Sequence, residues 1–322
     1  MMYLHLIGGI VIMLAAAEML IRGAVSLAKI LNIPPLVIGM IVVAIGTSAP
    51  EFMVTLDASL SGAPGLAVGN LIGSNIANVL LILGISCLLS PIKGPKTANF
   101  RGSFVLMAGS ALFAVLCYQG QLSLMSGGVL FVAFLGFLVS TFRKESTDAD
   151  TAAEQIEEVE SMTTIAAPMG VVVLTVLGGL VGIVWGADLL VEGGVAIARV
   201  FGVSEEVIGL TVIAFGTSLP ELAASVMAAY HGHSDIALGN VVGSNLFNIL
   251  GIAGLVAMVT PLPVSDAILS FDIWVMLGAT ALVLPILGGR WHPRRASGAF
   301  FLTLYLAYIG YNGFLAGLFA GG

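Results

Sequence analysis

The sequence predicts an all-α integral membrane protein with ten transmembrane helices arranged as two inverted five-helix repeats. Four observations lead to this prediction. Of 322 residues, 58% are hydrophobic and only 9% are charged, whereas soluble domains carry about 25% charged residues. Apolar stretches recur along the whole chain, and about 20 helical residues suffice to cross a hydrocarbon core. Finally, two motifs occur twice at a fixed offset, and basic residues gather on particular connections.

The repeated motifs indicate an internal duplication. Residues 46–51 read Gly-Thr-Ser-Ala-Pro-Glu, and residues 216–221 read Gly-Thr-Ser-Leu-Pro-Glu, 170 positions later. The same offset relates Gly-Asn-Leu-Ile-Gly-Ser-Asn-Ile-Ala-Asn at 69–78 to Gly-Asn-Val-Val-Gly-Ser-Asn-Leu-Phe-Asn at 239–248. No insertion interrupts the offset between these motifs, so the two halves are expected to fold alike.

The expected helices are separated by clusters of Pro, Gly, Asn and Ser, such as residues 61–65 and 260–263. They form a first repeat at residues 1–142, an acidic linker at residues 143–167 and a second repeat at residues 168–322. The expected transmembrane spans are residues 4–28, 35–60, 66–89, 101–118, 122–142, 168–198, 204–229, 235–259, 266–288 and 297–319.

The placement of Lys and Arg predicts the orientation. The connections after the first, third, fifth and ninth helices carry the basic residues, whereas the opposite side has only Arg199. The positive-inside rule places those loops and the linker in the cytoplasm, and both termini outside the cell membrane. Each repeat then has an odd number of helices, so the second enters from the opposite side, as in many secondary transporters.

Glu51 and Glu221 are the main candidate functional residues. A carboxylate inside the membrane costs several kcal/mol unless it is paired, protonated or bound to a cation. No Lys or Arg lies near either one in its own helix or in the following motif helix. A protonated glutamate bonded to a neighbouring helix is the simple alternative. Two carboxylates at a repeat interface would instead offer a formal charge of −2, which suits a divalent cation.

Hydroxyl groups precede each glutamate by four and three residues and share its helical face. They belong to Thr47, Ser48, Thr217 and Ser218. Pro50 and Pro220 should kink the helices and free backbone oxygens. Hard oxygen donors suit calcium and sodium, and the absence of Cys and His from the motifs argues against zinc or copper. The simple alternative is a proline kink with Thr and Ser bonded back to their own helix.

The second motif adds polar groups to the next helix of each repeat. One turn separates Ser74 from Asn78, and likewise Ser244 from Asn248, so each pair shares a face. We favour a place beside the cation site for both pairs. Asn75 and Asn245 are expected to bond helix to helix, and the glycines at positions 69, 73, 239 and 243 to let helices approach closely.

The paired motifs resemble the two alpha repeats of the sodium/calcium exchanger family, over residues 8–91 and 178–261. The resemblance implies a ten-helix antiporter whose transported ions are its substrates, without a cofactor and without an evident obligate protein partner. It implies that Glu51 and Glu221 bind calcium and that Thr47 and Thr217 contribute oxygen. The implied sodium ligands are Ser48, Ser74, Ser218, Ser244 and the carbonyl groups of Ala44 and Ala214.

The motifs also separate branches of this superfamily. An aspartate at the position of Asn248 is typical of potassium-dependent relatives, so this chain resembles potassium-independent ones. Proton-driven members typically carry Gly-Asn-x-x-Glu in place of the first motif, yet a proton/calcium antiporter stays the nearest alternative. A passive cation channel is a different class. An intramembrane enzyme is not expected, because no His-Glu-x-x-His or Gly-x-Gly-Asp motif is present. The net charge of −7 reflects the acidic linker and gives no sign of a nucleic-acid partner.

Other ionisable residues are weaker candidates. Glu18 and Asp188 are equivalent by the offset, and an i,i+4 pair with Arg22 explains Glu18. His231 and His233 fall in an expected loop and are predicted to lie on the surface.

Overall fold

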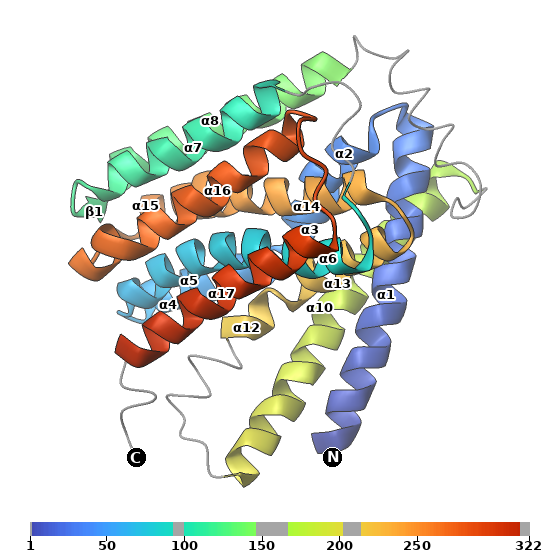
Figure 1. Ribbon diagram of the computed structural model, residues 1–322, viewed down its shortest axis with the longest axis horizontal. Coiled ribbons are helices and arrows are strands. Elements are labelled where there is room, and N and C mark those ends of the chain that lie inside the picture. Colours follow the sequence, from blue (N-terminus) through green and yellow to red (C-terminus); the bar gives the residue numbers. More distant parts are fainter. Residues whose placement is uncertain (1, 93–99, 146–166, 202–213, 316–322) are drawn as a thin grey trace.

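The computed structural model describes residues 2–92, 100–145, 167–201 and 214–315. These residues form helices with short connections, in agreement with the expected all-α class (Figure 1). Among them, β-structure is confined to Gln121–Leu122 (β1) and Leu262–Pro263 (β2), which pair antiparallel. The linker expected at residues 143–167 lies mostly outside the described residues.

Each half contains a long first helix followed by shorter ones. The helices of the first half are α1 (Met2–Leu31), α2 (Pro35–Ile38), η1 (Gly39–Val43), α3 (Ala44–Thr47), α4 (Ala49–Leu60), α5 (Pro64–Ala77), η2 (Asn78–Ile82), α6 (Leu83–Leu89), α7 (Phe100–Cys117) and α8 (Leu124–Glu145). Those of the second half are α10 (Met169–Val200), α12 (Ala214–Thr217), α13 (Leu219–Tyr230), α14 (Ser234–Leu246), η4 (Phe247–Ile252), α15 (Ala253–Val259), η5 (Ile268–Asp272), α16 (Ile273–Leu287) and α17 (Arg295–Leu315).

The duplication in the sequence reappears in the helix bounds. The helices α4 and α13, and likewise α6 and α15, begin and end 170 positions apart. A π-helical turn follows the second motif helix in both halves, at η2 and at η4. Such turns are rare and often lie at functional sites. Equivalent sequence has therefore produced equivalent local structure.

The long helices α1 and α10 run side by side and are steeply inclined to the remaining helices (Figure 1). Glycines allow this close packing. A Cβ atom placed on Gly186 would lie 2.6 Å from the backbone nitrogen of Met13, and one on Gly9 would lie 2.6 Å from that of Leu190. Small residues at such contacts let two backbones approach in a membrane protein.

Both motif helices are interrupted where the prolines predict a break. Ser48 separates α3 from α4, and the segments on its two sides are bent by 43°. Ser218 separates α12 from α13 in the same way, and its backbone angles (φ −90°, ψ 3°) resemble those of Ser48 (φ −81°, ψ 11°). Pro50 and Pro220 lie in the first turn of the restarting helices, where a missing N–H is tolerated. The predicted kinks are confirmed as full breaks.

Six described helices are long and apolar enough to cross a bilayer, and the bent pair from Pro35 to Leu60 brings the number to seven. Helix α7 is apolar but shorter, and the expected span at residues 204–229 begins outside the described residues. The chain is thus a multi-pass membrane protein, while the number of ten spans stays a prediction.

Candidate functional site

The two helix breaks face each other. Glu51 and Glu221 lie in the first turn of α4 and of α13, and each is 1% exposed. The Oγ atom of Ser48 donates to Oε1 of Glu221 at 2.8 Å, and that of Ser218 donates to Oε1 of Glu51 at 3.2 Å. The serine of each motif thus donates a hydrogen bond to the glutamate of the other motif. The structure brings together the pair of carboxylates that the sequence singled out.

The partners of these carboxylates are neutral. Within the described residues, no ion pair includes Glu51 or Glu221. The second carboxylate oxygen of each, Oε2, is buried and accepts no hydrogen bond. The first turn of a helix offers partial positive charge, which helps an anion but does not neutralise it. Two buried carboxylates without a basic partner require a cation or protons.

The neutral oxygens nearby extend the set of possible ligands. Thr47 is buried, and its hydroxyl lies 3.3 Å from Oδ1 of Asn240 and 3.4 Å from the carbonyl oxygen of Ala44. That carbonyl also accepts the N–H of Ser48 at 3.0 Å. The Thr47 hydroxyl therefore contacts its own helix, as the simple alternative expects, and it also contacts Asn240 of the second half. In the second half, Ala214 and Thr217 begin and end α12, and Thr217 is buried.

The serines and asparagines of the second motif are also buried. Ser74, Asn78, Ser244 and Asn248 are each at most 5% exposed. Several of their polar atoms have no hydrogen-bond partner: Oδ1 of Asn78, Oγ of Ser244, and both Oδ1 and Nδ2 of Asn248. Buried polar atoms without partners are rare in folded proteins, and an ion or water is a common reason for them. Their place beside a cation site stays a prediction.

One expectation about the asparagines is confirmed and one is corrected. Asn245 bonds helix to helix, because its Nδ2 donates to the carbonyl of Asn75 at 3.3 Å and its Oδ1 accepts from Asn78 at 3.0 Å. The side chain of Asn75 instead donates to the carbonyl of Leu71 in its own helix at 2.7 Å. Helical spacing alone did not distinguish a bond along the helix from one across to a neighbour.

The glycines of the second motif differ between the halves. Cβ atoms on Gly239 and Gly243 would collide with the carbonyl oxygens of Leu36 and Met40. The absence of a side chain at these two glycines therefore lets α2 and η1 pack closely against α14. Within the described part of the chain, a Cβ on Gly69 or Gly73 would meet no atom within 4 Å. The expected close approach is therefore confirmed for the second copy.

The structure adds four residues that the sequence reading left out: Asn70, Asn240, Thr55 and Ser225. The Nδ2 atom of Asn70 lies 3.4 Å from the carbonyl oxygen of Glu51, and Asn240 makes the same contact with Glu221 at 3.3 Å. A signal for them was available, because Asn70 and Asn240 are 170 positions apart and each is the second residue of the second motif. Thr55 and Ser225 are related by the same offset and both carry a hydroxyl.

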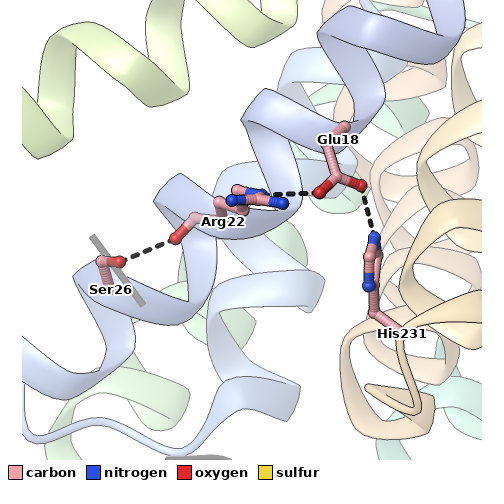
Figure 2. Close-up of polar contacts among 4 residues, drawn as sticks. All are labelled: Glu18, Arg22, Ser26 and His231. Carbon is pink, nitrogen blue, oxygen red and sulfur yellow. Dashed lines mark hydrogen bonds and ion pairs between the residues drawn. The ribbon is translucent and has the colours of Figure 1, made fainter. Parts of the chain in front are cut away.

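Glu18 belongs to a separate cluster (Figure 2). Its Oε1 accepts from Nε of Arg22 at 2.5 Å, so the expected i,i+4 pair is confirmed. Its Oε2 contacts Nε2 of His231, at the end of α13. The expected surface position of the histidines is wrong, because the His231 side chain is only 23% exposed and His233 is 7% exposed. Polar loop sequence did not reveal that α1 covers this turn.

Comparison with known proteins assigns the class. The family model "Sodium/calcium exchanger protein" matches residues 1–143 and 171–314, so the chain belongs to the sodium/calcium exchanger family. It is 37% identical over 311 residues to the putative antiporter CaxA of Alkalimonas amylolytica, covering 94% of this chain and 95% of that protein.

A second sequence and a solved structure, both of sodium/calcium exchangers, are also similar to this chain. The sodium/calcium exchanger MaX1 of Methanosarcina acetivorans is 32% identical over 340 residues, covering 95% of this chain and 97% of that protein. The solved structure of the sodium-calcium exchanger NCX_Mj superposes with a TM-score of 0.82 at 30% identity, covering 95% of this chain and 96% of that one. The chain is accordingly a membrane transporter of the antiporter class rather than an enzyme, and its ions are substrates rather than cofactors.

Proposed function

We propose that this chain is a secondary active antiporter that exchanges sodium for calcium, with the cations bound between Glu51 and Glu221. The main support is the reciprocal pair of bonds from Ser48 to Glu221 and from Ser218 to Glu51. It places two buried carboxylates, without any described basic partner, at the contact between the two motif copies. A formal charge of −2 in that position is balanced by one calcium ion or by more than one sodium ion.

The proposed ligand set is rich in oxygen. Glu51 and Glu221 bind calcium, and Thr47 and Thr217 add backbone or side-chain oxygen. Sodium ions use the hydroxyl groups of Ser48, Ser74, Ser218 and Ser244 and the backbone carbonyl groups of Ala44 and Ala214. The side chains of Asn78 and Asn248 lie beside these ligands. The described residues contain no cluster of three His, Cys, Asp or Glu side chains. A cation here therefore relies on two carboxylates and neutral oxygens, the ligands that calcium prefers.

The proposed architecture makes the site accessible from both sides in turn. The chain has ten transmembrane helices in two inverted five-helix repeats, at residues 1–142 and 168–322, joined by a cytoplasmic linker. Both termini lie outside the cell membrane. The duplicated helix bounds and duplicated helix breaks support this arrangement. Sites between inverted repeats lie near the middle of the membrane, where either face can open to them.

Coupling follows from the charge of the site. Two empty carboxylates repel one another in a medium of low dielectric constant, so closing the site without a cation is unfavourable. Either calcium or sodium neutralises the pair and permits the change of access. Because the two kinds of ion compete for the same glutamates, uphill movement of one is driven by the other.

The decisive experiment uses purified protein in sealed lipid vesicles. We expect calcium uptake when sodium leaves the vesicles down its gradient, and no requirement for potassium. Uptake driven by a proton gradient instead would favour the proton/calcium alternative. Calcium flux that never exceeds equilibrium under any imposed gradient would identify a channel and overturn the proposal.

A further inference from the structure

Each glutamate of the site is attached to the next helix through its main chain. Nδ2 of Asn70, on α5, lies 3.4 Å from the carbonyl oxygen of Glu51 and 3.0 Å from Oγ1 of Thr55. Oγ1 of Thr55 itself donates to that carbonyl at 2.6 Å. One amide and one hydroxyl thus converge on a single backbone oxygen, beyond the bonds of a regular helix.

The second half repeats the two contacts of the asparagine amide. Nδ2 of Asn240, on α14, lies 3.3 Å from the carbonyl oxygen of Glu221 and 2.9 Å from Oγ of Ser225. Asn240 and Ser225 are both fully buried. Asparagine, hydroxyl residue and glutamate each recur 170 positions apart, so the whole triplet is duplicated together.

Asn240 also links the two halves. Its Oδ1 lies 3.3 Å from Oγ1 of Thr47, whose chain continues through the break at Ser48 into Glu51. One amide therefore contacts the first motif with its oxygen and the backbone of Glu221 with its nitrogen. In this arrangement Nδ2 points to carbonyl and hydroxyl oxygens and Oδ1 accepts from a hydroxyl, so both polar atoms of the amide contact protein groups.

We propose that Asn70 and Asn240 are positioning residues, which set where the carboxylates of Glu51 and Glu221 lie by attaching each glutamate turn to the adjacent motif helix. This inference rests on the proposed function. Calcium ligands must lie at about 2.3–2.6 Å from the ion, and binding groups need placement to within about 0.5 Å. A tether on the glutamate main chain controls that placement without occupying a ligand position.

Removing the tether should weaken binding rather than folding alone. We expect Asn70→Ala and Asn240→Ala to raise the calcium and sodium concentrations for half-maximal exchange by about tenfold, the effect of one or two lost hydrogen bonds. Calcium should also raise the melting temperature of these variants less than that of the original protein. A purely structural role would lower the yield or the melting temperature while leaving the half-maximal concentrations unchanged.

A matched pair tests the hydroxyl of the triplet. Thr55→Val keeps the shape but loses the acceptor and should reproduce the defect of Asn70→Ala. Thr55→Ser keeps the hydroxyl and should retain normal affinity. Asn75→Ala serves as the control, because this buried asparagine bonds within its own helix. If Asn240→Ala does not fold, the part-buried Asn70 and the Thr55 pair still decide the matter.

The outcomes separate this inference from the function on which it rests. Absence of sodium-driven calcium uptake by the original protein would overturn the proposed function. Normal affinities in Asn70→Ala and Thr55→Val, together with exchange that depends on Glu51, would overturn the positioning role alone.

Discussion

Glu18 and Glu51 are carboxylates of the same half of the chain, yet their charges are balanced in opposite ways. The Glu18 side chain is 27% exposed and contacts Arg22 and His231 (Figure 2). Glu51 is 1% exposed, and its described side-chain partner is the neutral hydroxyl of Ser218. Glu18 therefore has a permanent counter-charge from the protein, whereas Glu51 and Glu221 have no basic partner among the described residues. In the proposed function, the missing basic side chain leaves the charge of Glu51 and Glu221 to be balanced by the transported ion.

The largest effect should come from neutralising the unpaired carboxylates. We expect Glu51→Gln and Glu221→Gln each to abolish sodium-driven calcium uptake into vesicles, because the amide keeps the shape but removes the charge. Size-exclusion chromatography should show that both variants are folded. Substantial gradient-driven flux in both would remove the distinction between Glu51 and Glu18.

Cations should stabilise the protein through the same pair. A ligand that binds only the folded state at a hundred times its dissociation constant adds about 2.7 kcal/mol to the free energy of unfolding. We expect the melting temperature in detergent to be higher with calcium than with a chelator. The double variant Glu51→Gln/Glu221→Gln should lose this difference. Equal melting temperatures for the original protein in both conditions would contradict the assignment.

The reciprocal serine bonds should matter less than the carboxylates. Hydrogen bonds to charged groups contribute about 1.5–3 kcal/mol, so we expect Ser48→Ala and Ser218→Ala each to weaken apparent calcium affinity by about ten- to a hundredfold without abolishing exchange. Ser86→Ala is the matched control, since Ser86 is buried and its hydroxyl has no hydrogen-bond partner. Equal effects of all three substitutions on affinity would show that the loss is not specific to the site.

The smallest effect on transport is expected at the internally balanced carboxylate. Glu18→Gln removes a partly exposed ion pair, and such pairs contribute about 1 kcal/mol or less. Exchange rate and calcium affinity should stay close to those of the original protein, with a slight fall in melting temperature. Loss of exchange in this variant, comparable to that of Glu51→Gln, would show that the two carboxylates are not functionally distinct.

The sequence predicted the meeting of the two glutamates better than the contacts around them. Duplicated motifs predicted that Glu51 and Glu221 belong together, because the two residues occupy equivalent positions in matching motifs. The prolines predicted the interruptions at Ser48 and Ser218. These inferences succeeded since they depend on local chemistry and on a fixed offset, both of which are visible in one dimension.

What escaped prediction depends on contacts between distant segments. The contact between Glu18 and His231 joins residues 213 positions apart, and nothing near His231 marks it as covered by another helix. The role of Asn70 depends on a carbonyl oxygen, which every residue carries and which no motif can single out. The side-chain direction of Asn75 was likewise invisible, because its own helix and a neighbouring helix offer the same kind of acceptor.

The π-helical turns at η2 and η4 have a consequence for the history of the chain. A π-helical turn arises when one extra residue enters an α-helix, and that residue rotates everything beyond it by about 100°. The irregularity begins at Asn78 in one half and at Phe247, one position before the equivalent Asn248, in the other. Two independent insertions at matching points would be a coincidence. Their matching positions agree with a common origin of the two halves, which the fixed offset of 170 positions also indicates.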